Sequence, residues 1–354
     1  MTDVAKLVIV GTPENDHLVA VPTRPWTGLE DDNTILGLEG DDWLEGRGGN
    51  DRLVGGPGDD TLDGGLGDDT AVYSLPRQAY EVFRYDPAGG GHEAVVRGPE
   101  GVDTLLAVEH LEFRTASGAP DRVPLTGFAA FPALAYLAAN PDLAGAFGGD
   151  ADRAWLHFRD FGAKEDRATS FDGLRYVAGQ RDLAAWLAPL GDPTAIAAAG
   201  TEHYVLHGRA EGRVPDAFDG LRYVAGQRDL AAWLAPLGDP ATIAAAGTEH
   251  YVLHGRAEGR DPEAFDGLRY VAGQRDLAAW LAPLGDPAAI ADAGTEHYVL
   301  HGRAEGRAPE VFNDERYLFK YPDLLAAGLT PEQATLHYIL HGLAEGRTDQ
   351  ILIA

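Results

Sequence analysis

A single apolar residue recurs every nine positions between residues 28 and 72, within units that are otherwise rich in glycine and acidic residues. Each unit has glycine at its first position, Asp or Asn at its sixth and, with one exception, Ile or Leu at its eighth. The five units are GLEDDNTIL (28–36), GLEGDDWLE (37–45), GRGGNDRLV (46–54), GGPGDDTLD (55–63) and GGLGDDTAV (64–72). The eighth position holds Ile35, Leu44, Leu53, Leu62 and Ala71. GTPENDHLV (11–19) fits the same frame loosely, and residues 20–27 interrupt it.

This pattern predicts a flattened roll of very short parallel strands. Glycines allow tight turns with positive φ, and the residues around the eighth position form a strand with one inward apolar side chain. Two units make one coil of the roll, so the turn of each unit lies beside that of the second unit after it. The sixth-position side chains should then face one another along each edge, in the pairs Asn33/Asp51, Asp42/Asp60 and Asp51/Asp69.

A different pattern follows in residues 73–128. AYEVFRY and HEAVVR alternate apolar and polar residues as strands do, and GVDTLLAVEHLEF comes after them. We expect a small β segment that covers the open end of the roll.

The remainder of the chain repeats with a longer period. Phe171, Phe218 and Phe265 lie 47 residues apart and open three nearly identical units, and a shorter unit opens at Phe312. A diverged copy begins near Phe131. In unit 171–217, Asp172, Asp182 and Asp192 are suitable N-caps, Pro193 follows the last of them, and Gly208 is placed as the residue that ends the third helix. Three short helices per unit predict a helical repeat array.

Each helical unit contains a pair of histidines four residues apart, a spacing that can bind a metal. The pairs are His203/His207, His250/His254, His297/His301 and His337/His341. The same helix face is largely apolar, and the diverged copy has Phe158 and Phe161 where unit 171–217 has Tyr204 and His207. Packing is therefore the favoured role, with metal binding as the alternative. The recurring Asp182 and Glu-x-Arg positions are interpreted as caps and inter-helix ion pairs, with a repeated ligand-contact row as the alternative.

Composition narrows the classes of function. The chain has 354 residues and a formal net charge of −28, which argues against binding to a nucleic-acid backbone and favours cations. It has no cysteine, so disulfides and thiolate metal sites are excluded. The N-terminus MTDVAKLVIVG lacks the basic region and long apolar run of a Sec signal peptide. No apolar run is long enough to predict a membrane span.

The nonapeptides resemble the RTX (repeats-in-toxin) family, whose unit is Gly-Gly-x-Gly-x-Asp-x-apolar-x. The resemblance covers roughly residues 11–113 and implies a Ca²⁺-bound parallel β-roll and export through a type I secretion apparatus. It places about two or three Ca²⁺ ions in the roll, with the Asp42/Asp60 site best formed. Departures from the pattern are Leu29, Leu38 and Arg47 at the second position, Asp31 at the fourth and Asn33 at the sixth. The expected calcium-site residues are Asn33, Gly37, Asp42, Gly46, Asp51, Gly55, Gly58, Asp59, Asp60, Gly64 and Asp69.

Residues 131–347 resemble a short helical repeat of bacterial secreted proteins that carries no assigned activity. The C-terminal TDQILIA (348–354) resembles an uncleaved type I secretion signal, although a frayed tail explains it nearly as well. The expected fold is therefore α+β and multidomain. Its segments are a roll (1–74), a β cap (75–128), five helical repeats (129–170, 171–217, 218–264, 265–311 and 312–347) and a tail (348–354).

The sequence contains no recognised catalytic motif, because the glycine-rich nucleotide loops, HExxH and G-x-S-x-G are all missing. The favoured function is that of a secreted, calcium-folded structural or adhesive protein, not an enzyme, whose helical array binds or spaces a cell-surface or matrix component. One alternative is a secreted enzyme or toxin-like effector with an unrecognised site in the helical array. Another is a cytoplasmic scaffold.

Overall fold

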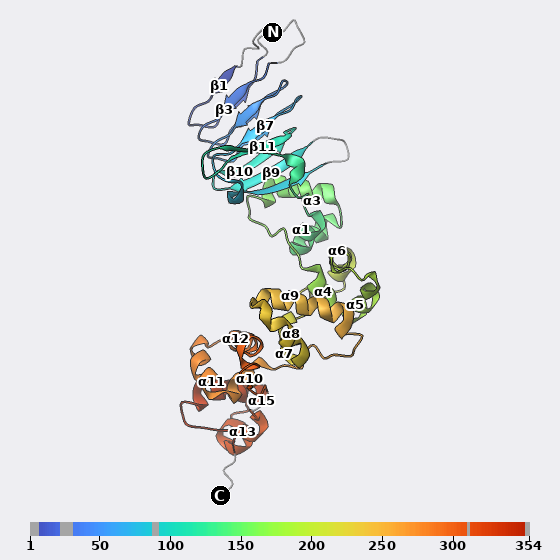
Figure 1. Ribbon diagram of the computed structural model, residues 1–354, viewed down its shortest axis with the longest axis vertical. Helices are drawn as coiled ribbons and strands as arrows, with labels where there is room; N and C mark the ends of the chain where they lie inside the picture. The colour runs from blue at the N-terminus through green and yellow to red at the C-terminus, as the bar shows by residue number, and fades with distance from the viewer. Residues whose placement is uncertain (1–6, 22–30, 87–91, 310–311, 351–354) are drawn as a thin grey trace. The chain divides into compact units, whose positions relative to one another are not determined.

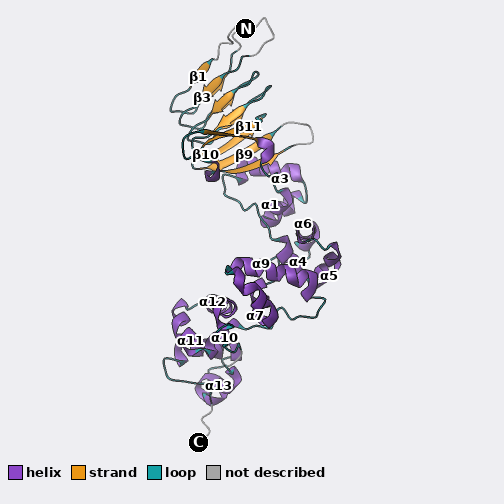
Figure 2. Ribbon diagram, viewed as in Figure 1, coloured by secondary structure: helices purple, strands orange, loops and turns teal. Residues whose placement is uncertain are grey.

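The computed structural model describes residues 7–21, 31–86, 92–309 and 312–350. The chain forms two compact units, Met1–Phe171 and Asp172–Ala354. The first contains all the described strands together with three helices, and the second is helical (Figures 1 and 2). The predicted loop at 20–27 and the tail at 348–354 lie mostly outside the described residues.

The first unit opens with strands of three residues each, as the nonapeptide pattern predicts. They are β1 (Val8–Val10), β2 (His17–Val19), β3 (Thr34–Leu36), β4 (Trp43–Glu45), β5 (Arg52–Val54), β6 (Thr61–Asp63) and β7 (Thr70–Val72). Odd-numbered strands pair in parallel in one sheet and even-numbered strands in the other. This alternation confirms that two units make one coil and that each unit stacks on the second one after it.

The eighth-position side chains form the core between the two sheets. Ile35, Leu44, Leu53, Leu62 and Ala71 are at most 1% exposed. They pack in one cluster with Leu105 and Leu111 from later strands. Each unit thus contributes one fully buried apolar side chain to this core.

Five longer strands complete both sheets. They are β8 (Glu81–Tyr85), β9 (Glu93–Gly98), β10 (Gly101–Leu106), β11 (His110–Arg114) and β12 (Pro120–Pro124). β10 pairs in parallel with β6, and β11 in parallel with β7, so the segment after the repeats continues the roll. β9, β8 and β12 then add antiparallel strands that end the sheets. Two short 3₁₀ turns, Arg77–Ala79 and Leu125–Gly127, connect the elements.

The first helical repeat packs against this β structure within the same unit. It consists of α1 (Ala133–Ala139), α2 (Pro141–Phe147), α3 (Ala151–His157) and a π-helical turn at Phe158–Gly162. The Trp155 indole donates a 2.7 Å hydrogen bond to Glu93 on β9. Phe83 on β8 packs edge-on against Phe131 and Phe158. Aromatic contacts of this kind seal the junction between sheet and helices.

The second unit contains three short helices per repeat, as the caps predict. The helices are α4 (Gly173–Gly179), α5 (Arg181–Leu187), α6 (Pro193–His203), α7 (Gly220–Gly226), α8 (Arg228–Leu234), α9 (Pro240–His250), α10 (Gly267–Gly273), α11 (Arg275–Leu281), α12 (Pro287–His297), α13 (Asp314–Lys320), α14 (Pro322–Ala326) and α15 (Pro331–His337). Short 3₁₀ turns follow α5, α8 and α11, at Ala188–Leu190, Ala235–Leu237 and Ala282–Leu284. The third helix of each repeat continues into a π-helical turn, at Tyr204–Gly208, Tyr251–Gly255, Tyr298–Gly302 and Tyr338–Gly342.

Two of the three predicted caps are confirmed. Asp172 accepts a hydrogen bond from the main-chain N–H of Arg175 in the first turn of α4, and Asp192 accepts from those of Thr194 and Ala195 in the first turn of α6. The prediction for Asp182 is wrong, because α5 begins at Arg181 with Gln180 as its N-cap. Asp182 lies in the first turn and binds the Arg213 guanidinium, with a shortest N–O distance of 2.8 Å.

The third helix ends at Gly208, as predicted, since its π-helical turn covers Tyr204–Gly208. The left-handed C′ role given to Gly208 is wrong, because Arg209 follows it in right-handed helical conformation and the left-handed residue is Gly212, whose φ is +72°. Gly208 is needed for a different reason, since a Cβ there would collide with the Tyr176 hydroxyl.

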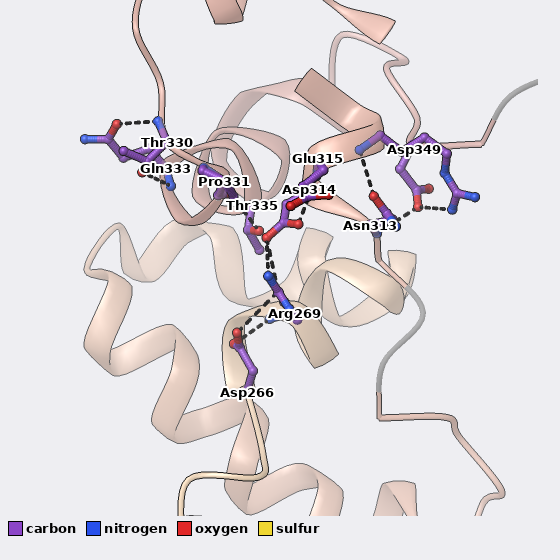
Figure 3. A network of polar contacts seen from close by, with 11 residues as sticks. Asp266, Arg269, Asn313, Asp314, Glu315, Thr330, Pro331, Gln333, Thr335 and Asp349 are labelled. Atoms are coloured by element: carbon purple, nitrogen blue, oxygen red, sulfur yellow. Dashed lines mark hydrogen bonds and ion pairs between the residues drawn. The ribbon is translucent and has the colours of Figure 1, made fainter. Parts of the chain in front are cut away.

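A polar network joins the last two repeats (Figure 3). Asp314 is buried and lies where the three preceding units have glycine. It accepts a 2.6 Å hydrogen bond from Arg269 of the preceding repeat. In the earlier repeats the corresponding arginines, Arg175 and Arg222, donate instead to the main-chain carbonyls of Phe218 and Phe265.

Candidate metal centre

The sixth-position side chains form a hydrogen-bonded ladder along each edge of the roll. Oδ1 of Asp60 accepts from the main-chain N–H of Asp42 at 2.9 Å. The same bond joins Asn33 N–H to Asp51 at 2.6 Å, and Asp51 N–H to Asp69 at 2.7 Å. The structure therefore brings together all three pairs that the sequence predicts.

A second ladder runs through the fifth positions in the opposite direction. Oδ1 of Asp41 accepts from the N–H of Asp59, 18 residues later. On the other edge, Asn50 N–H donates to Oδ1 of Asp32, and Oδ1 of Asn50 accepts from the N–H of Asp68. Asp59, an expected calcium ligand, thus lies in this outer ladder, and its other oxygen is 3.0 Å from the Lys164 ammonium.

The second oxygen of the sixth-position carboxylates is the unusual feature of this structure. Oδ2 of Asp42, Asp60 and Asp69 is buried and makes no hydrogen bond. A Cβ on Gly37, Gly55 or Gly64 would collide with this oxygen of the same unit. A Cβ on Gly46 would likewise collide with Oδ2 of Asp51. The first-position glycines therefore make room for a carboxylate oxygen that is turned into its own loop. A buried polar atom without a partner is costly.

Main-chain carbonyls are further oxygens in the same loops. The Leu38 and Gly40 carbonyls lie so close to Gly56 and Gly58 of the next unit on that edge that a Cβ on either glycine would collide with them. Carboxylate and carbonyl oxygens are the donors that hard cations such as Ca²⁺ prefer. Within the described part of the chain, no group of three or more His, Cys, Asp or Glu side chains is arranged to hold a metal. Main-chain carbonyls would therefore have to contribute to any site here.

Burial changes the proton affinity of these carboxylates. It raises the pKa of Asp60 and of Asp69 to about 7, and raises the pKa of Asp42 to a smaller extent. Desolvation is the largest cause, and neighbouring carboxylates add to it. Without a cation, Asp60 and Asp69 therefore titrate near neutrality. With a cation they would be ionised, because a metal ligand must be deprotonated.

The structure adds two carboxylates that the sequence did not assign to the site, since Asp60 N–H donates to Asp103 and Asp69 N–H donates to Glu109. Asp16 joins the ladder through its main-chain N–H, which donates to Asp42, while its own carboxylate accepts from Thr12. Asp103 is 3% exposed, and burial raises its pKa well above the ordinary value. A signal for it was present, since GPEGVDTLL (98–106) follows the nonapeptide frame.

The recurring histidines of the helical repeats have a packing role at the first position of each pair. Nδ1 of His203 lies 3.0 Å from the buried Tyr176 hydroxyl, and the same pair recurs as His250/Tyr223, His297/Tyr270 and His337/Tyr317. The second histidine, as at His207, is exposed. The predicted Asp and Glu-x-Arg ion pair is confirmed, since Arg213 binds Asp182 and Glu211.

Comparison with protein families identifies the nonapeptide region. The family model for the RTX calcium-binding nonapeptide repeat, in four copies, matches residues 27–58 and 36–71. No curated protein matches the chain. Of the helices in the described ranges, none combines the length and apolar character needed to cross a bilayer.

Proposed function

Because residues 27–71 are RTX calcium-binding nonapeptide repeats, we propose that this is a secreted protein whose N-terminal roll folds when it binds Ca²⁺ outside the cell. The helical repeats serve as a spacer or binding surface. The observation that carries the proposal is the row of buried carboxylate oxygens without hydrogen-bond partners at Asp42, Asp60 and Asp69. A cation would satisfy them, and nothing else in the described part of the roll does so.

Folding of the roll then depends on the Ca²⁺ concentration of the compartment that contains the chain. At low cytosolic Ca²⁺, repulsion within a chain of net charge −28 and the conformational entropy of its glycines oppose packing. Extracellular modules bind Ca²⁺ with a Kd of about 10⁻⁴–10⁻³ M, so the roll would fold after export. Metal binding energy would then be folding energy.

The two or three ions of the proposal occupy the edges of the roll between stacked units. Asp42/Asp60 and Asp51/Asp69 pair aspartates, whereas Asn33/Asp51 has an amide on one side. A neutral amide attracts Ca²⁺ less than a carboxylate does, so the Asn33/Asp51 position is the weakest of the three. A type I secretion apparatus is the proposed export route, and residues 348–354 are its proposed signal.

The helical repeats are proposed to be non-catalytic and adhesive. Trp186, Trp233 and Trp280 occupy equivalent positions in three repeats and are 67–69% exposed. Large exposed aromatic side chains are enriched in interfaces. A cell-surface or matrix component is the proposed partner. The Trp186→Ala, Trp233→Ala and Trp280→Ala triple variant should keep its fold and lose retention on whole cells.

The proposal is tested by titrating Ca²⁺ into the EDTA-treated full chain and following far-UV circular dichroism. Strand signal should grow with Ca²⁺ and should not grow with equal concentrations of Mg²⁺, which demands stricter octahedral geometry. The Asp42→Asn, Asp60→Asn double variant should need more Ca²⁺. If the roll already shows its full strand signal in EDTA, calcium-dependent folding is wrong.

A further inference from the structure

Residues 98–106 have the internal pattern of a nonapeptide unit, although they lie 25 residues beyond the last matched repeat. In GPEGVDTLL, Gly98 stands first, Gly101 fourth, Asp103 sixth and Leu105 eighth. Leu105 is fully buried in the same core as Leu62 and Leu44. The family match ends at residue 71 and does not include this segment.

Main-chain contacts place 98–106 on unit 55–63 in the way that 55–63 stacks on 37–45. Gly58 N–H donates to the third-position carbonyl of Glu100 at 2.7 Å, just as Gly40 N–H donates to that of Pro57 at 3.0 Å. Thr104 N–H donates to the sixth-position carbonyl of Asp60, as Thr61 N–H does to that of Asp42. The strand registers agree as well, because Leu105 pairs with Leu62 and Leu62 with Leu44.

Both side-chain ladders also continue into the segment. Asp60 N–H donates to Oδ1 of Asp103 at 3.0 Å, the sixth-position bond. Val102 N–H donates to Oδ1 of Asp59 at 2.9 Å, the fifth-position bond. The two ladders retain their opposite directions. The stacking is therefore that of a repeat unit, with the difference that a Cβ on its first-position Gly98 would meet the Tyr80 ring and not Asp103.

The fourth-position glycine reproduces the close approach found between repeats. Gly58 has a φ of +148°, and Gly101 has one of +137°. A Cβ on Gly58 would collide with the Gly40 carbonyl, and a Cβ on Gly101 would collide with the Gly58 carbonyl. The same carbonyl approach is thus present at this junction. Asp60, whose Oδ2 is buried without a hydrogen bond, belongs to the unit on which 98–106 stacks.

We propose that residues 98–106 are a displaced repeat unit and that, with unit 55–63, they form a further Ca²⁺ site between Asp60 and Asp103. The inference rests on the proposed calcium binding of the matched repeats and adds a site to them. Asp60 then belongs to two sites, one shared with Asp42 and one with Asp103. Asp103 belongs to one only, since β10 is followed in its sheet by the antiparallel strand β9.

On the opposite edge of the roll, beside Asp69, the segment that follows the repeats is not a complete unit. There, Glu109 accepts from Asp69 N–H at 2.8 Å and so continues the ladder. Only residues 107–109 separate β10 from β11, so the loop with its second- and fourth-position carbonyls is missing. No site is proposed at that position.

A site at Asp103 would fasten the hairpin of β9 and β10 to the roll. Six residue pairs connect these two strands, from Gly101/Gly98 to Leu106/Glu93. An ion held between 55–60 and 98–103 would therefore couple the last repeats to the strands that close the sheet. Ca²⁺ should protect the amides of residues 93–106 from hydrogen exchange together with those of 55–63.

The experiment counts bound Ca²⁺ by native mass spectrometry in the full chain and three variants. Asp103→Asn retains an oxygen that can accept from Asp60 N–H and removes only the charge. Glu39→Gln makes the same charge change at an exposed position, and Asp42→Asn acts within the matched repeats. We expect one ion fewer in Asp103→Asn, at least one fewer in Asp42→Asn, and no loss in Glu39→Gln.

The outcomes separate this inference from the function on which it rests. A wild-type chain that binds no Ca²⁺ overturns the proposed function. Undiminished binding in Asp103→Asn, with loss in Asp42→Asn, overturns the displaced site alone. Should Asp103→Asn fail to fold, hydrogen exchange of the wild-type chain decides. Protection of residues 101–106 at the same Ca²⁺ midpoint as 55–63 supports the site, and its absence overturns it.

Discussion

Oδ1 of Asp60 accepts a 2.9 Å hydrogen bond from the main-chain N–H of Asp42, while Oδ2 of the same carboxylate is buried without a hydrogen-bond partner. One oxygen thus fixes the side chain in its orientation, and the other is left for a ligand. Preorganisation of this kind reduces the ordering cost of binding.

Calcium affinity should fall as the pH drops from 8 to 6. The pKa of Asp60 and of Asp69 is raised to about 7 in the absence of a cation, and Ca²⁺ must displace those protons. Calorimetry in two buffers of different ionisation enthalpy should therefore detect proton release near pH 7. Equal heats in both buffers would contradict the prediction.

The metal-free roll should show the opposite dependence on pH. Its folded state holds these protons more tightly than the unfolded chain, in which Asp titrates near pH 4. This contribution to stability is present below about pH 4 and is lost as the pH rises through about 7. The strand signal that remains in EDTA should therefore be larger at pH 5 than at pH 8, and far-UV circular dichroism at the two pH values tests the sign.

Leu38→Gly should stabilise the roll by about 0.5–1 kcal/mol, because a left-handed backbone costs a side-chain-bearing residue more than it costs glycine. Leu38 has a φ of +92° at a position where units 55–63 and 64–72 have glycine. Gly56→Ala is the matched control, since its φ is +116° and a Cβ would strike the Leu38 carbonyl. Thermal unfolding in saturating Ca²⁺ should move in opposite directions for the two variants.

The helical repeats should lose stability as the pH falls below about 6.5, the ordinary pKa of histidine. Burial is the largest cause that lowers the pKa of His203, His250, His297 and His337. The folded state therefore resists protonation, and this stability is present above the ordinary pKa and lost below it. Hydrogen exchange of α6, α9, α12 and α15 measures the effect. The His207→Gln variant changes an exposed histidine and should retain the same loss of stability at low pH.

Arg269→Met should cost more than Arg222→Met, by about 2 kcal/mol in the free energy of unfolding, because it leaves the buried Asp314 carboxylate without its cation. Arg222 binds only main-chain carbonyls of the next repeat, so its loss leaves no buried charge. Equal costs for the two variants would show that the network in Figure 3 adds no stability. Urea unfolding of the second unit's helical signal provides the comparison.

The roll could be predicted from the sequence because every nonapeptide unit contains the residues that its own turn and strand need. A first-position glycine makes room for the aspartate, and the eighth-position leucine fills the core. The unit at 98–106 was not identified because residues 73–97 interrupt the period, and stacking restores it only in space. Asp60 and Asp103 are 43 residues apart, whereas Asp42 and Asp60 are 18 apart.

The two errors in the helical repeats have local causes. Gly208 is followed by Arg209 N–H, which bonds to the Tyr204 carbonyl five residues earlier. This hydrogen bond keeps Arg209 in right-handed conformation, so the left-handed glycine after the helix is Gly212 and not Gly208. Asp182 lies two residues after Gln180, whose extended backbone makes it the cap, so the aspartate side chain is available for Arg213.

The chain leaves the roll after Val72 and returns at Gly98 with the register intact, as the pairing of Thr104 with Thr61 shows. A stacked array of this kind therefore tolerates insertion of a folded segment between successive units. New modules could be grafted at the same junction without redesign of the repeats on either side. The same property allows such arrays to diversify by acquiring hairpins internally, and not only by lengthening at their ends.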